Sequence, residues 1–350
     1  MQTVELQAMG CSGRAVLLAD GPAARDALRG LPGWLAARER ILSRFDPESE
    51  LARLNARGGT DRASEVLWAA LEVALAAASE TDGLVTPTVL PALLVAGYDR
   101  PFDEMRRGDG EDGEGGPRGD AAGAPRRPAP DVRAIERDAT TRSIRLPPGV
   151  LLDLGGTAKG WTADVAAAHL GRVAPALVDL GGDIAVAGSA PEPWPIAVDD
   201  PRRGRAAPGS AASSASLREP RAPEHEVDLD LVLLASGGVA TSGTDHRRWW
   251  RGGRERHHLI DPRTGAPASS DVRTVTVIGP SALAAEIAAK RVLLAGASAG
   301  LAWLETRPEL AGVVVRCDAE AIPPGPPKAG GGWQTIRSRR FHARVWKDSA

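Results

Sequence analysis

The chain has 350 residues, of which 43% are hydrophobic and 25% are charged, and this balance is typical of a globular protein. A formal net charge of −2 excludes the basic field of a nucleic-acid-binding protein and a strongly basic membrane-binding surface. Two cysteines are too few for a disulfide framework. No run approaches the roughly 18 apolar residues of a membrane span, and the first residues lack the basic and apolar regions of a signal peptide. We therefore expect a cytoplasmic protein without membrane insertion.

The first third of the chain predicts a hairpin and two helices. Apolar residues alternate in Thr3–Met9 and Arg14–Asp20, which is typical of two paired strands. Ala23–Phe45 and Arg62–Ser79 are rich in alanine and leucine at helical spacing. Asp103–Pro130 is dominated by Gly, Asp, Arg and Pro, so we expect a solvated insertion there.

The remainder of the chain contains more strands than helices. Helices are predicted at about Ala158–Leu170 and Ser281–Ala295, and a second low-complexity insertion at about Pro201–Glu226. The strand-like segments are Ile144–Leu146, Ala176–Leu180, Trp194–Val198, Asp228–Leu234, Val272–Ile278 and Gly312–Arg316, and the tail Trp333–Trp346 predicts an edge hairpin. Because strands dominate and many connections are short, we expect a single α+β domain over residues 1–350, with mixed, largely antiparallel sheets and packed helices.

The segment Leu152–Gly160, Leu-Asp-Leu-Gly-Gly-Thr-Ala-Lys-Gly, is interpreted as the end of a strand and the start of a helix. Gly155 and Gly156 allow the backbone to approach a ligand closely, and the exposed N–H groups together with Lys159 form an anion site. Asp153 is a candidate acceptor for a ligand N–H or hydroxyl. The alternative is a glycine-rich turn between a strand and a helix that binds no ligand.

Three further segments combine glycine turns with polar side chains. Leu177–Asp183 contains a second glycine pair flanked by acids at the end of an apolar strand, and Val239–Gly243 ends in Thr-Ser-Gly. His257–Gly265 joins imidazole, carboxylate, a rigid proline and a glycine turn. This combination makes His258 and Asp261 candidates for acid–base catalysis; the alternative is a hydrogen-bonded pair that stabilises the loop.

These four segments resemble, in the same order, the D-L-G-G-x-A-K-G, D-x-G-G-[DE], T-S-G and H-x-I-D-P-x-T-G motifs of the FAD:protein FMN transferase (ApbE) family. Three upstream segments extend the resemblance: Ala8–Gly10 is similar to M-G-T, Phe45–Asn55 to [YF]-x-P-x-S-E-[LI]-x-x-[LF]-N, and Thr81–Thr88 to D-G-x-F-D-P-T. The resemblance covers about residues 8–316 outside the two insertions. Seven motifs in one order specify the family far more closely than any one of them does.

The resemblance implies an ApbE-like (T-fold-related) fold and an enzyme that cleaves FAD, couples FMN through a phosphoester bond to a Ser or Thr of an acceptor flavoprotein, and releases AMP. FAD is then the substrate, Mg²⁺ the usual cofactor, and the acceptor flavoprotein the partner. Carried over position by position, the residues expected to bind FAD are Met9, Phe45, Leu84, Val85, Thr86, Asp153, Lys159, Asp179, Gly181, Gly182, Thr241, Ser242 and His258. The catalytic candidates are Lys159, His258 and Asp261, and the metal positions are the Gly156 carbonyl, Glu286 and Lys290.

Three departures from the family pattern bear on the chemistry. Cys11 stands where the family has Thr, Val85 and Thr86 replace Phe-Asp, and Glu286 and Lys290 stand where an Asp and a Thr supply metal ligands. A protonated lysine has no lone pair, so Lys290 is not expected to bind Mg²⁺. We predict instead that its ammonium pairs with Glu286 at i, i+4 spacing and offsets pyrophosphate charge, so that the chain depends less on Mg²⁺. Two alternatives stay open: a hydrolase that splits FAD with water, and a non-catalytic flavin-binding protein with an altered metal site.

Overall fold

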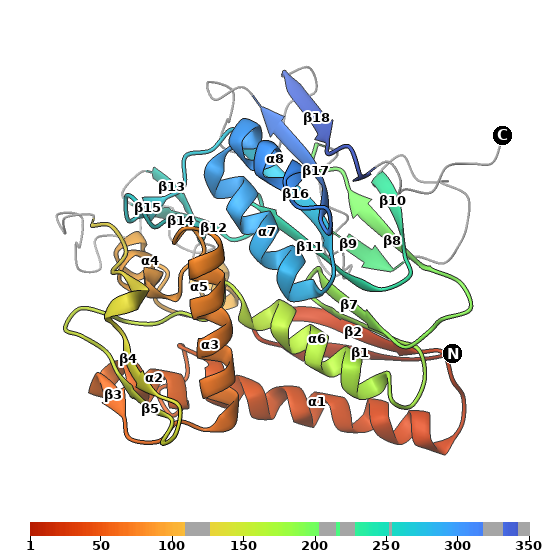
Figure 1. Cartoon of the computed structure of the whole chain (residues 1–350), viewed down its shortest axis with the longest axis horizontal. Coiled ribbons are helices and arrows are strands. Elements are labelled where there is room, and N and C mark those ends of the chain that lie inside the picture. Colours follow the sequence, from red (N-terminus) through yellow and green to blue (C-terminus); the bar gives the residue numbers. More distant parts are fainter. Residues whose placement is uncertain (109–126, 203–214, 218–227, 252–253, 318–331, 342–350) are drawn as a thin grey trace. The chain divides into compact units, whose positions relative to one another are not determined.

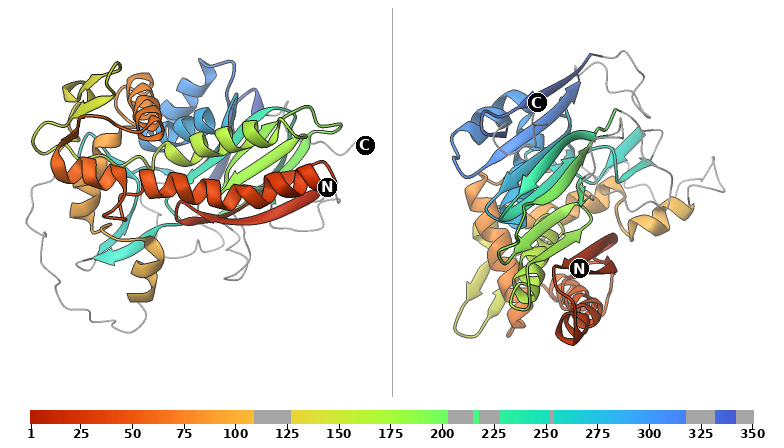
Figure 2. Two further views of the ribbon diagram at one scale, coloured as in Figure 1. Left: turned by 90° about the horizontal axis from the view of Figure 1, so that it is seen from below. Right: turned by 90° about the vertical axis from the view of Figure 1, so that its right-hand side faces the viewer.

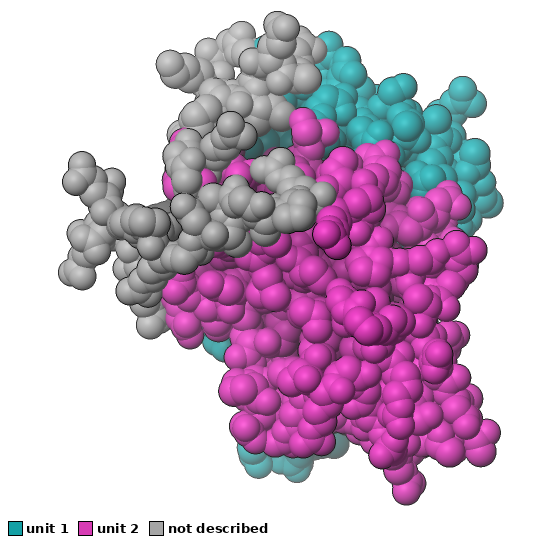
Figure 3. All heavy atoms as spheres, turned by 90° about the vertical axis from the view of Figure 1, so that its left-hand side faces the viewer, with its two compact units in different colours: residues 1–35, 159–243, 270–350 teal, residues 36–158, 244–269 magenta. Residues whose placement is uncertain are grey.

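The protein is described here from a computed structural model, which places residues 1–108, 127–202, 215–217, 228–251, 254–317 and 332–341 (Figures 1 and 2). Most of the two predicted insertions lies outside these residues. The chain groups into two compact units: unit 1 comprises residues 1–35, 159–243 and 270–350, and unit 2 comprises residues 36–158 and 244–269 (Figure 3). The expectation of one domain over the whole chain stays a prediction. Among the described residues, no helix is both long enough and apolar enough to span a bilayer.

Unit 1 is built on a sheet with eight described strands, in which every neighbouring pair is antiparallel (Figure 1). The strand order is β1-β2-β6-β7-β11-β16-β17-β18. The strands are β1 (Gln2–Ala8), β2 (Cys11–Leu17), β6 (Ala176–Leu180), β7 (Asp183–Ala187), β11 (Gly237–Gly243), β16 (Val272–Gly279), β17 (Ala311–Cys317) and β18 (Trp333–Arg337). The sheet confirms the predicted α+β class, and β1 with β2 confirms the opening hairpin.

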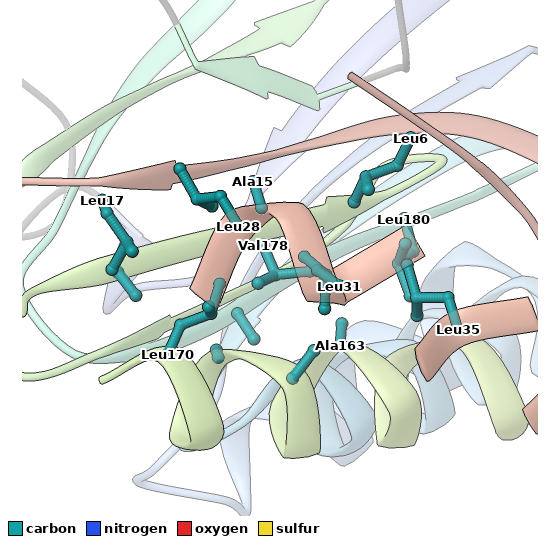
Figure 4. Packing of buried hydrophobic residues seen from close by; sticks show 14 of the residues in the cluster. Leu6, Ala15, Leu17, Leu28, Leu31, Leu35, Ala163, Leu170, Val178 and Leu180 are labelled. Atoms are coloured by element: carbon teal, nitrogen blue, oxygen red, sulfur yellow. The ribbon is translucent and has the colours of Figure 1, made fainter. Parts of the chain in front are cut away.

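One face of this sheet is covered by two helices, α1 (Pro22–Leu42) and α6 (Ala158–Leu170) (Figure 2). Side chains alternate between the two faces of a strand, and Leu17 of β2 belongs to the buried cluster on this side. Leu31 of α1 and Leu170 of α6 belong to the same cluster, which Figure 4 shows from close by. Each fully buried leucine of this kind stabilises the fold by about 1.5–3 kcal/mol.

The opposite face of the sheet packs against a second, three-stranded sheet in the order β10-β8-β9. Its strands are β8 (Trp194–Asp199), β9 (Ala215–Leu217) and β10 (Asp228–Leu234). Val16, the neighbour of Leu17 in β2, points to this side and shares a buried cluster with Ile196 of β8, Val232 of β10 and Phe341. Alternate side chains of β2 therefore contribute to two hydrophobic cores, one on each face of the central sheet.

Helix α7 (Ala282–Ala295) packs on β11 and β16, and α8 (Ala297–Glu305) packs on α7 and β17. The start of α7 is fixed by two side chains. Ser281 accepts a hydrogen bond from the N–H of Ala284 at 3.0 Å, as an N-cap residue does. Asp164 of α6 accepts hydrogen bonds from the N–H groups of Ala282 and Leu283 at 2.8 and 3.0 Å. These N–H groups have no partner within α7, so the two bonds link α6 to the start of α7.

Unit 2 consists of short helices and small antiparallel sheets. Its helical segments are α2 (Glu50–Arg57), α3 (Glu65–Glu80), η1 (Pro87–Val89), α4 (Leu90–Ala96), α5 (Phe102–Gly108) and η2 (Val132–Ala134). Its strands are β3 (Gly59–Thr60), β4 (Glu136–Asp138), β5 (Ser143–Arg145), β12 (Arg248–Arg251), β13 (Arg254–His257), β14 (Ile260–Asp261) and β15 (Ala266–Pro267). Ser49 and Ser64 cap α2 and α3, each accepting a backbone N–H three residues on.

The structure corrects three of the predicted elements. The first part of the predicted insertion is helical, because Phe102–Gly108 forms α5. The long first helix ends at Leu42, three residues before the predicted end. No strand runs directly into the glycine pair of Leu152–Gly160, because the described residues 146–154 form no strand. Instead, the side-chain amide of Asn55 donates to the Leu152 carbonyl at 2.9 Å and accepts its N–H at 2.8 Å, which replaces the pairing a neighbouring strand would give.

Two other predictions are met only in part. The tail provides a single edge strand, β18, which pairs with β17, and the second half of the predicted hairpin lies outside the described residues. The insertion predicted at 201–226 includes the short strand β9, which pairs with β8, and most of its other residues are not described.

Candidate functional site

Two hairpin turns lie side by side at one edge of unit 1. Met9 and Gly10 join β1 to β2 with φ angles of 55° and 68°, and Gly181 and Gly182 join β6 to β7 with φ angles of 69° and 94°. Two positive φ angles in a two-residue turn define the type I′ hairpin, which glycine adopts without strain and methionine does not. A Cβ atom at Gly181 would lie 2.9 Å from the Cys11 sulfur, so the two turns are in contact. The second glycine pair is thus required by the fold itself.

Asp179 holds the Gly181–Gly182 turn in place. Its carboxylate is buried and accepts the N–H of Gly182 at 2.8 Å. Thr241 and Ser242, two further residues of unit 1 predicted to bind FAD, lie at the end of β11. The Thr241 hydroxyl is 2.8 Å from that of Thr276 on β16, and Ser242 is buried. These side chains therefore have structural roles whether or not they contact a ligand.

Four charged side chains converge in unit 1 and form what we call the charge cluster: Lys159, Asp183, Glu286 and Lys290. The ammonium of Lys159 forms an ion pair with Asp183 and lies 3.3 Å from Glu286 Oε1. The ammonium of Lys290 lies 2.8 Å from the same Glu286 oxygen. Glu286 and Asp183 are 1% and 3% exposed, and Lys290 and Lys159 are 14% and 17% exposed. The predicted Glu286–Lys290 pair is confirmed, but it is buried and contains a second lysine.

The close approach of α6 to α7 explains how Glu286 is held. The N–H of Gly160 donates to Glu286 Oε2 at 3.0 Å. A Cβ atom at Gly160 would lie 2.9 Å from the carbonyl oxygen of Ala282 and from the Cα of Leu283, so only glycine fits there without displacing the backbone. Both oxygens of the Glu286 carboxylate are consequently occupied by hydrogen-bond donors.

Burial and opposite charges shift the pKa values in the charge cluster. Burial raises the pKa of Asp183 to about 6, Glu286 acts in the same direction and Lys159 opposes it. Burial alone would lower the pKa of Lys159, but the carboxylates of Asp183 and Glu286 outweigh it and raise that pKa. Burial alone would raise the pKa of Glu286, but Lys290 and Lys159 outweigh it and lower that pKa. At neutral pH the two carboxylates and two ammonium groups balance one another.

Asp153, in unit 2, is part of an ion pair that is packed against aromatic rings. Its Oδ2 is 2.5 Å from Nε of Arg44, and its Oδ1 accepts the N–H of Gly155 at 2.7 Å. The guanidinium of Arg44 lies 4.0 Å from the ring centre of Phe45 and 4.6 Å from that of Tyr98. Trp249 continues this group, with its ring centre 5.3 Å from that of Tyr98. Asp153 therefore orders its own turn and anchors a cation against two rings.

The predicted FAD-binding segment Leu84–Thr86 also lies in unit 2. Val85 is buried and its N–H donates to the hydroxyl of Thr81 at 2.9 Å. The Thr86 hydroxyl is 2.9 Å from that of Thr88, at the start of η1. The carbonyl of Pro87 accepts the N–H of Asp153 at 2.8 Å, so this segment is tied directly to the predicted ligand residue.

The segment that carries His258 and Asp261 forms a small hairpin, β14–β15, in unit 2. The Asp261 carboxylate accepts hydrogen bonds from the Arg263 backbone N–H at 2.9 Å and from its guanidinium at 2.9 and 2.8 Å. Burial alone would raise the pKa of Asp261, but the bonds from Arg263 outweigh it and lower that pKa. The N–H of His258 donates to the Arg247 carbonyl at 3.3 Å. Asp261 therefore stays ionised and stabilises its loop through Arg263, while its pairing with His258 stays a prediction.

The family model described as "ApbE family" matches residues 9–314 of this chain. The chain belongs to the ApbE family. It is 31% identical over 303 residues to the FAD:protein FMN transferase of Treponema pallidum, with 78% of this chain and 72% of that protein covered. It is 30% identical over 188 residues to an FAD:protein FMN transferase of Klebsiella pneumoniae, with 53% of this chain and 52% of that protein covered.

Solved structures of the ApbE family share the fold. The ApbE protein of Thermotoga maritima superposes with a TM-score of 0.73 at 23% identity, covering 99% of this chain and 100% of that one. The flavin transferase ApbE of Vibrio cholerae superposes with a TM-score of 0.69 at 20% identity, covering 98% and 99%. The likeness therefore extends over the whole architecture and not only over the motifs.

Within this ApbE chain, the structure adds residues that the sequence analysis did not select. Asp183 closes a recognised motif and pairs with Lys159, so its position at the end of that motif was an available signal. Tyr98 is the chain's single tyrosine, a signal from composition alone. Arg44 precedes the recognised Phe45, but nothing distinguishes it from the many other arginines. Gly160 ends its motif, and its importance follows only from the packing of α6 on α7.

The residues at the expected metal position do not fit Mg²⁺. Among the described residues, no group of three or more His, Cys, Asp or Glu side chains is arranged to hold a metal ion. Glu286 Oε1 faces the ammonium groups of Lys290 and Lys159, and its Oε2 accepts the N–H of Gly160. Mg²⁺ requires oxygen ligands at about 2.0–2.1 Å, and at this carboxylate two ammonium groups stand where the cation would bind. The third predicted position, Gly156, belongs to unit 2.

Proposed function

We propose that this chain is an FAD:protein FMN transferase. It cleaves the pyrophosphate of FAD and attaches FMN to a Ser or Thr hydroxyl of an acceptor flavoprotein. The hydroxyl oxygen forms a bond to the FMN phosphorus, the bond from that phosphorus to the bridging oxygen breaks, and AMP leaves with the bridging oxygen. Membership of the ApbE family over residues 9–314 carries this proposal.

The FAD-binding residues of unit 1 are proposed from the motif positions and supported by the geometry of the two turns. Met9 occupies a positive φ angle that is unfavourable for its side chain, and such strain is found at ligand-binding positions. The adjacent Gly181–Gly182 turn presents backbone without side chains. We propose that FAD contacts unit 1 at these turns, with Lys159 nearby in the same unit.

In unit 2 the proposal assigns a stacking role to the aromatic group. Phe45 is half-buried, so part of its ring is accessible, and Arg44 fixes its position. Planar rings such as isoalloxazine and adenine pack well on such surfaces. Asp153 then acts through Arg44, because both of its oxygens already accept hydrogen bonds or an ion pair.

For proton transfer the proposal keeps His258 and changes the role of Asp261. Removing the proton of the acceptor hydroxyl requires a group with a pKa near neutrality, and imidazole is the usual one. Asp261 has a lowered pKa and is bound by Arg263, so we assign it to positioning the loop that carries His258. A cytoplasmic setting for this reaction stays a prediction.

The test is to incubate the purified protein with FAD and an acceptor domain that contains a candidate Thr, with and without Mg²⁺. We expect flavin fluorescence on the acceptor band after denaturing electrophoresis, with AMP released in equal amount. An acceptor in which that Thr is changed to Val is the matched control and should remain unlabelled.

Other outcomes would favour the alternatives. AMP and free FMN without labelled acceptor would indicate the FAD hydrolase. Saturable FAD binding without AMP release, with several acceptors and with Mg²⁺ added, would indicate the non-catalytic flavin-binding protein. Absence of FAD binding in a calorimetric titration would contradict all three.

A further inference from the structure

We propose that the ammonium of Lys290 is a permanent counterion of Glu286, and that this chain binds no divalent metal ion at that carboxylate. The inference rests on the proposed function in one respect, because the expectation of a metal ion comes with that activity. It otherwise depends on the charge cluster alone, which is described within unit 1.

The first argument is the occupancy of the Glu286 oxygens. Oε1 lies 2.8 Å from the ammonium of Lys290 and 3.3 Å from that of Lys159. Oε2 lies 3.0 Å from the N–H of Gly160, which the α6 backbone fixes. A divalent ion bound at Oε1 would have to displace the ammonium groups. An ion bound at Oε2 would share that oxygen with the Gly160 N–H and lie beside the two ammonium groups on the other oxygen of the same carboxylate.

The second argument is charge balance in a buried place. Two carboxylates and two ammonium groups sum to zero, and Glu286 is 1% exposed. A bound divalent ion would add two positive charges beside two ammonium groups, where little water is present to screen the repulsion. Without Lys290 the same cluster would have a net negative charge, and Glu286 Oε1 would lose its nearest ammonium group.

The third argument is that Lys290 is fixed where it lies. It follows Glu286 by one turn on α7, in the orientation that favours a Glu–Lys pair, and its side chain is 14% exposed. A lysine ammonium is a compact point charge, unlike the planar fork of arginine. Lysine is rare in this chain, which uses it at four positions among 43 basic residues, and two of the four form this cluster.

The balanced cluster leads us to propose a different role for Lys290 from the one expected from the sequence. The sequence predicted that Lys290 offsets the charge of the FAD pyrophosphate. In the structure its charge is matched by Glu286, as that of Lys159 is by Asp183. Lys290 therefore takes the place of a metal ion at the Glu286 carboxylate, and the cluster has no surplus positive charge.

The test measures Mn²⁺ binding by electron paramagnetic resonance of free Mn²⁺, on protein without FAD and again with FAD. The variants are Glu286→Gln, which removes the anionic ligand, Lys290→Met, which keeps the length and removes the charge, and Lys290→Arg, which keeps the charge. Only Mn²⁺ binding that is lost on Glu286→Gln counts as binding at the Glu286 carboxylate. We expect none in wild type and in Lys290→Arg up to millimolar Mn²⁺. In Lys290→Met we expect one such site, with a dissociation constant at least tenfold below the highest Mn²⁺ concentration used, and we expect it to be lost when Glu286→Gln is added to Lys290→Met.

Glu286-dependent Mn²⁺ binding in wild type would overturn the proposal, and so would a folded Lys290→Met variant that binds no more than wild type. Circular dichroism checks that each variant folds. If Lys290→Met does not fold, the comparison of wild type with Glu286→Gln decides alone. Equal Mn²⁺ binding by these two proteins would support the proposal, and weaker binding by Glu286→Gln would overturn it. Because the measurement on protein without FAD needs neither FAD nor an acceptor, its outcome is independent of the transfer assay.

Discussion

Each unit of this protein buries a carboxylate–cation group, and the two groups are built differently. In unit 1, Glu286 and Asp183 are held by two lysines and a backbone N–H, with no aromatic ring among the contacts described. In unit 2, Asp153 is held by Arg44, which also lies over Phe45 and Tyr98. The first group depends on charge balance among four residues, whereas the second depends on a planar cation packed against two rings. The loss of one member should therefore affect the two groups unequally.

The largest effect is expected for Glu286→Ala. This change leaves the ammonium groups of Lys159 and Lys290 buried beside a single carboxylate, and breaking a buried ion pair from one side typically costs about 3–5 kcal/mol. We expect a loss of that size in the free energy of unfolding, measured by urea denaturation. Glu80→Ala, at the exposed end of α3, is the matched control and should change it by about 0.5 kcal/mol or less. Equal losses in the two variants would contradict the charge cluster.

The next effect is expected for Arg44→Ala in unit 2. It removes a charge-assisted bond to Asp153 and the contacts with two rings, so we expect a loss of about 2–3 kcal/mol by the same measurement. Arg44→Lys keeps the charge but cannot reproduce the planar stacking, and it should recover only part of the loss. If Arg44→Lys were as stable as wild type, charge alone would matter at Asp153. The two carboxylate–cation groups would then not differ in the way described.

A smaller effect is expected for Gly160→Ala. The added methyl would lie 2.9 Å from the Ala282 carbonyl oxygen, so α6 and α7 must separate slightly, at a cost of about 1–2 kcal/mol. Gly156→Ala is the matched control, because a Cβ atom there meets nothing within 4 Å. Thermal unfolding of the two variants should therefore separate them clearly. A Gly160→Ala variant as stable as Gly156→Ala would show that the approach of α6 to α7 is not tight.

The smallest effect is expected for Asp261→Asn. The folded pKa of Asp261 is lowered, so its contribution to stability is present above the unfolded value of 3.8 and is lost as pH falls through the folded pKa. Since Arg263 is largely exposed, solvent reduces this contribution to about 0.2–1 kcal/mol at pH 7. Denaturation of wild type and variant at pH 7 and pH 3 should show the difference shrinking at the lower pH. A difference that grows on acidification would reverse the assigned sign.

The sequence predicted much of the frame of unit 1 and little of the contacts inside it. Alternating and helical apolar patterns identified β1, β2, β6, α6 and α7, because burial on one or both faces leaves a period in the sequence. The strands of unit 2 have two to four residues, too few for a clear period, and only β5 was predicted, at Ile144–Leu146. Unit 2 also contains α2, which overlaps the Phe45–Asn55 motif and was not predicted as a helix.

The sequence identified many of the candidate residues but not which of them contact one another. Lys159 and Glu286 were named for different roles, and their proximity across 127 positions of sequence could not be read from spacing. The burial of Glu286 and Lys290 had an available signal: apart from these two residues and Arg291, α7 consists of Ala, Leu, Ile and Val, a composition typical of a largely buried helix. Arg44 had no such signal, because its role depends on Tyr98, which is distant in sequence.

The central claim is that Lys290, and not a metal ion, is the cation at Glu286. The most direct measurement is anomalous diffraction at the manganese edge from crystals of the wild-type protein soaked in Mn²⁺ with FAD. The account predicts no anomalous peak within bonding distance of the Glu286 carboxylate, and the Lys290 ammonium within hydrogen-bond distance of it. A manganese peak on that carboxylate, with the Lys290 side chain displaced, would contradict the account.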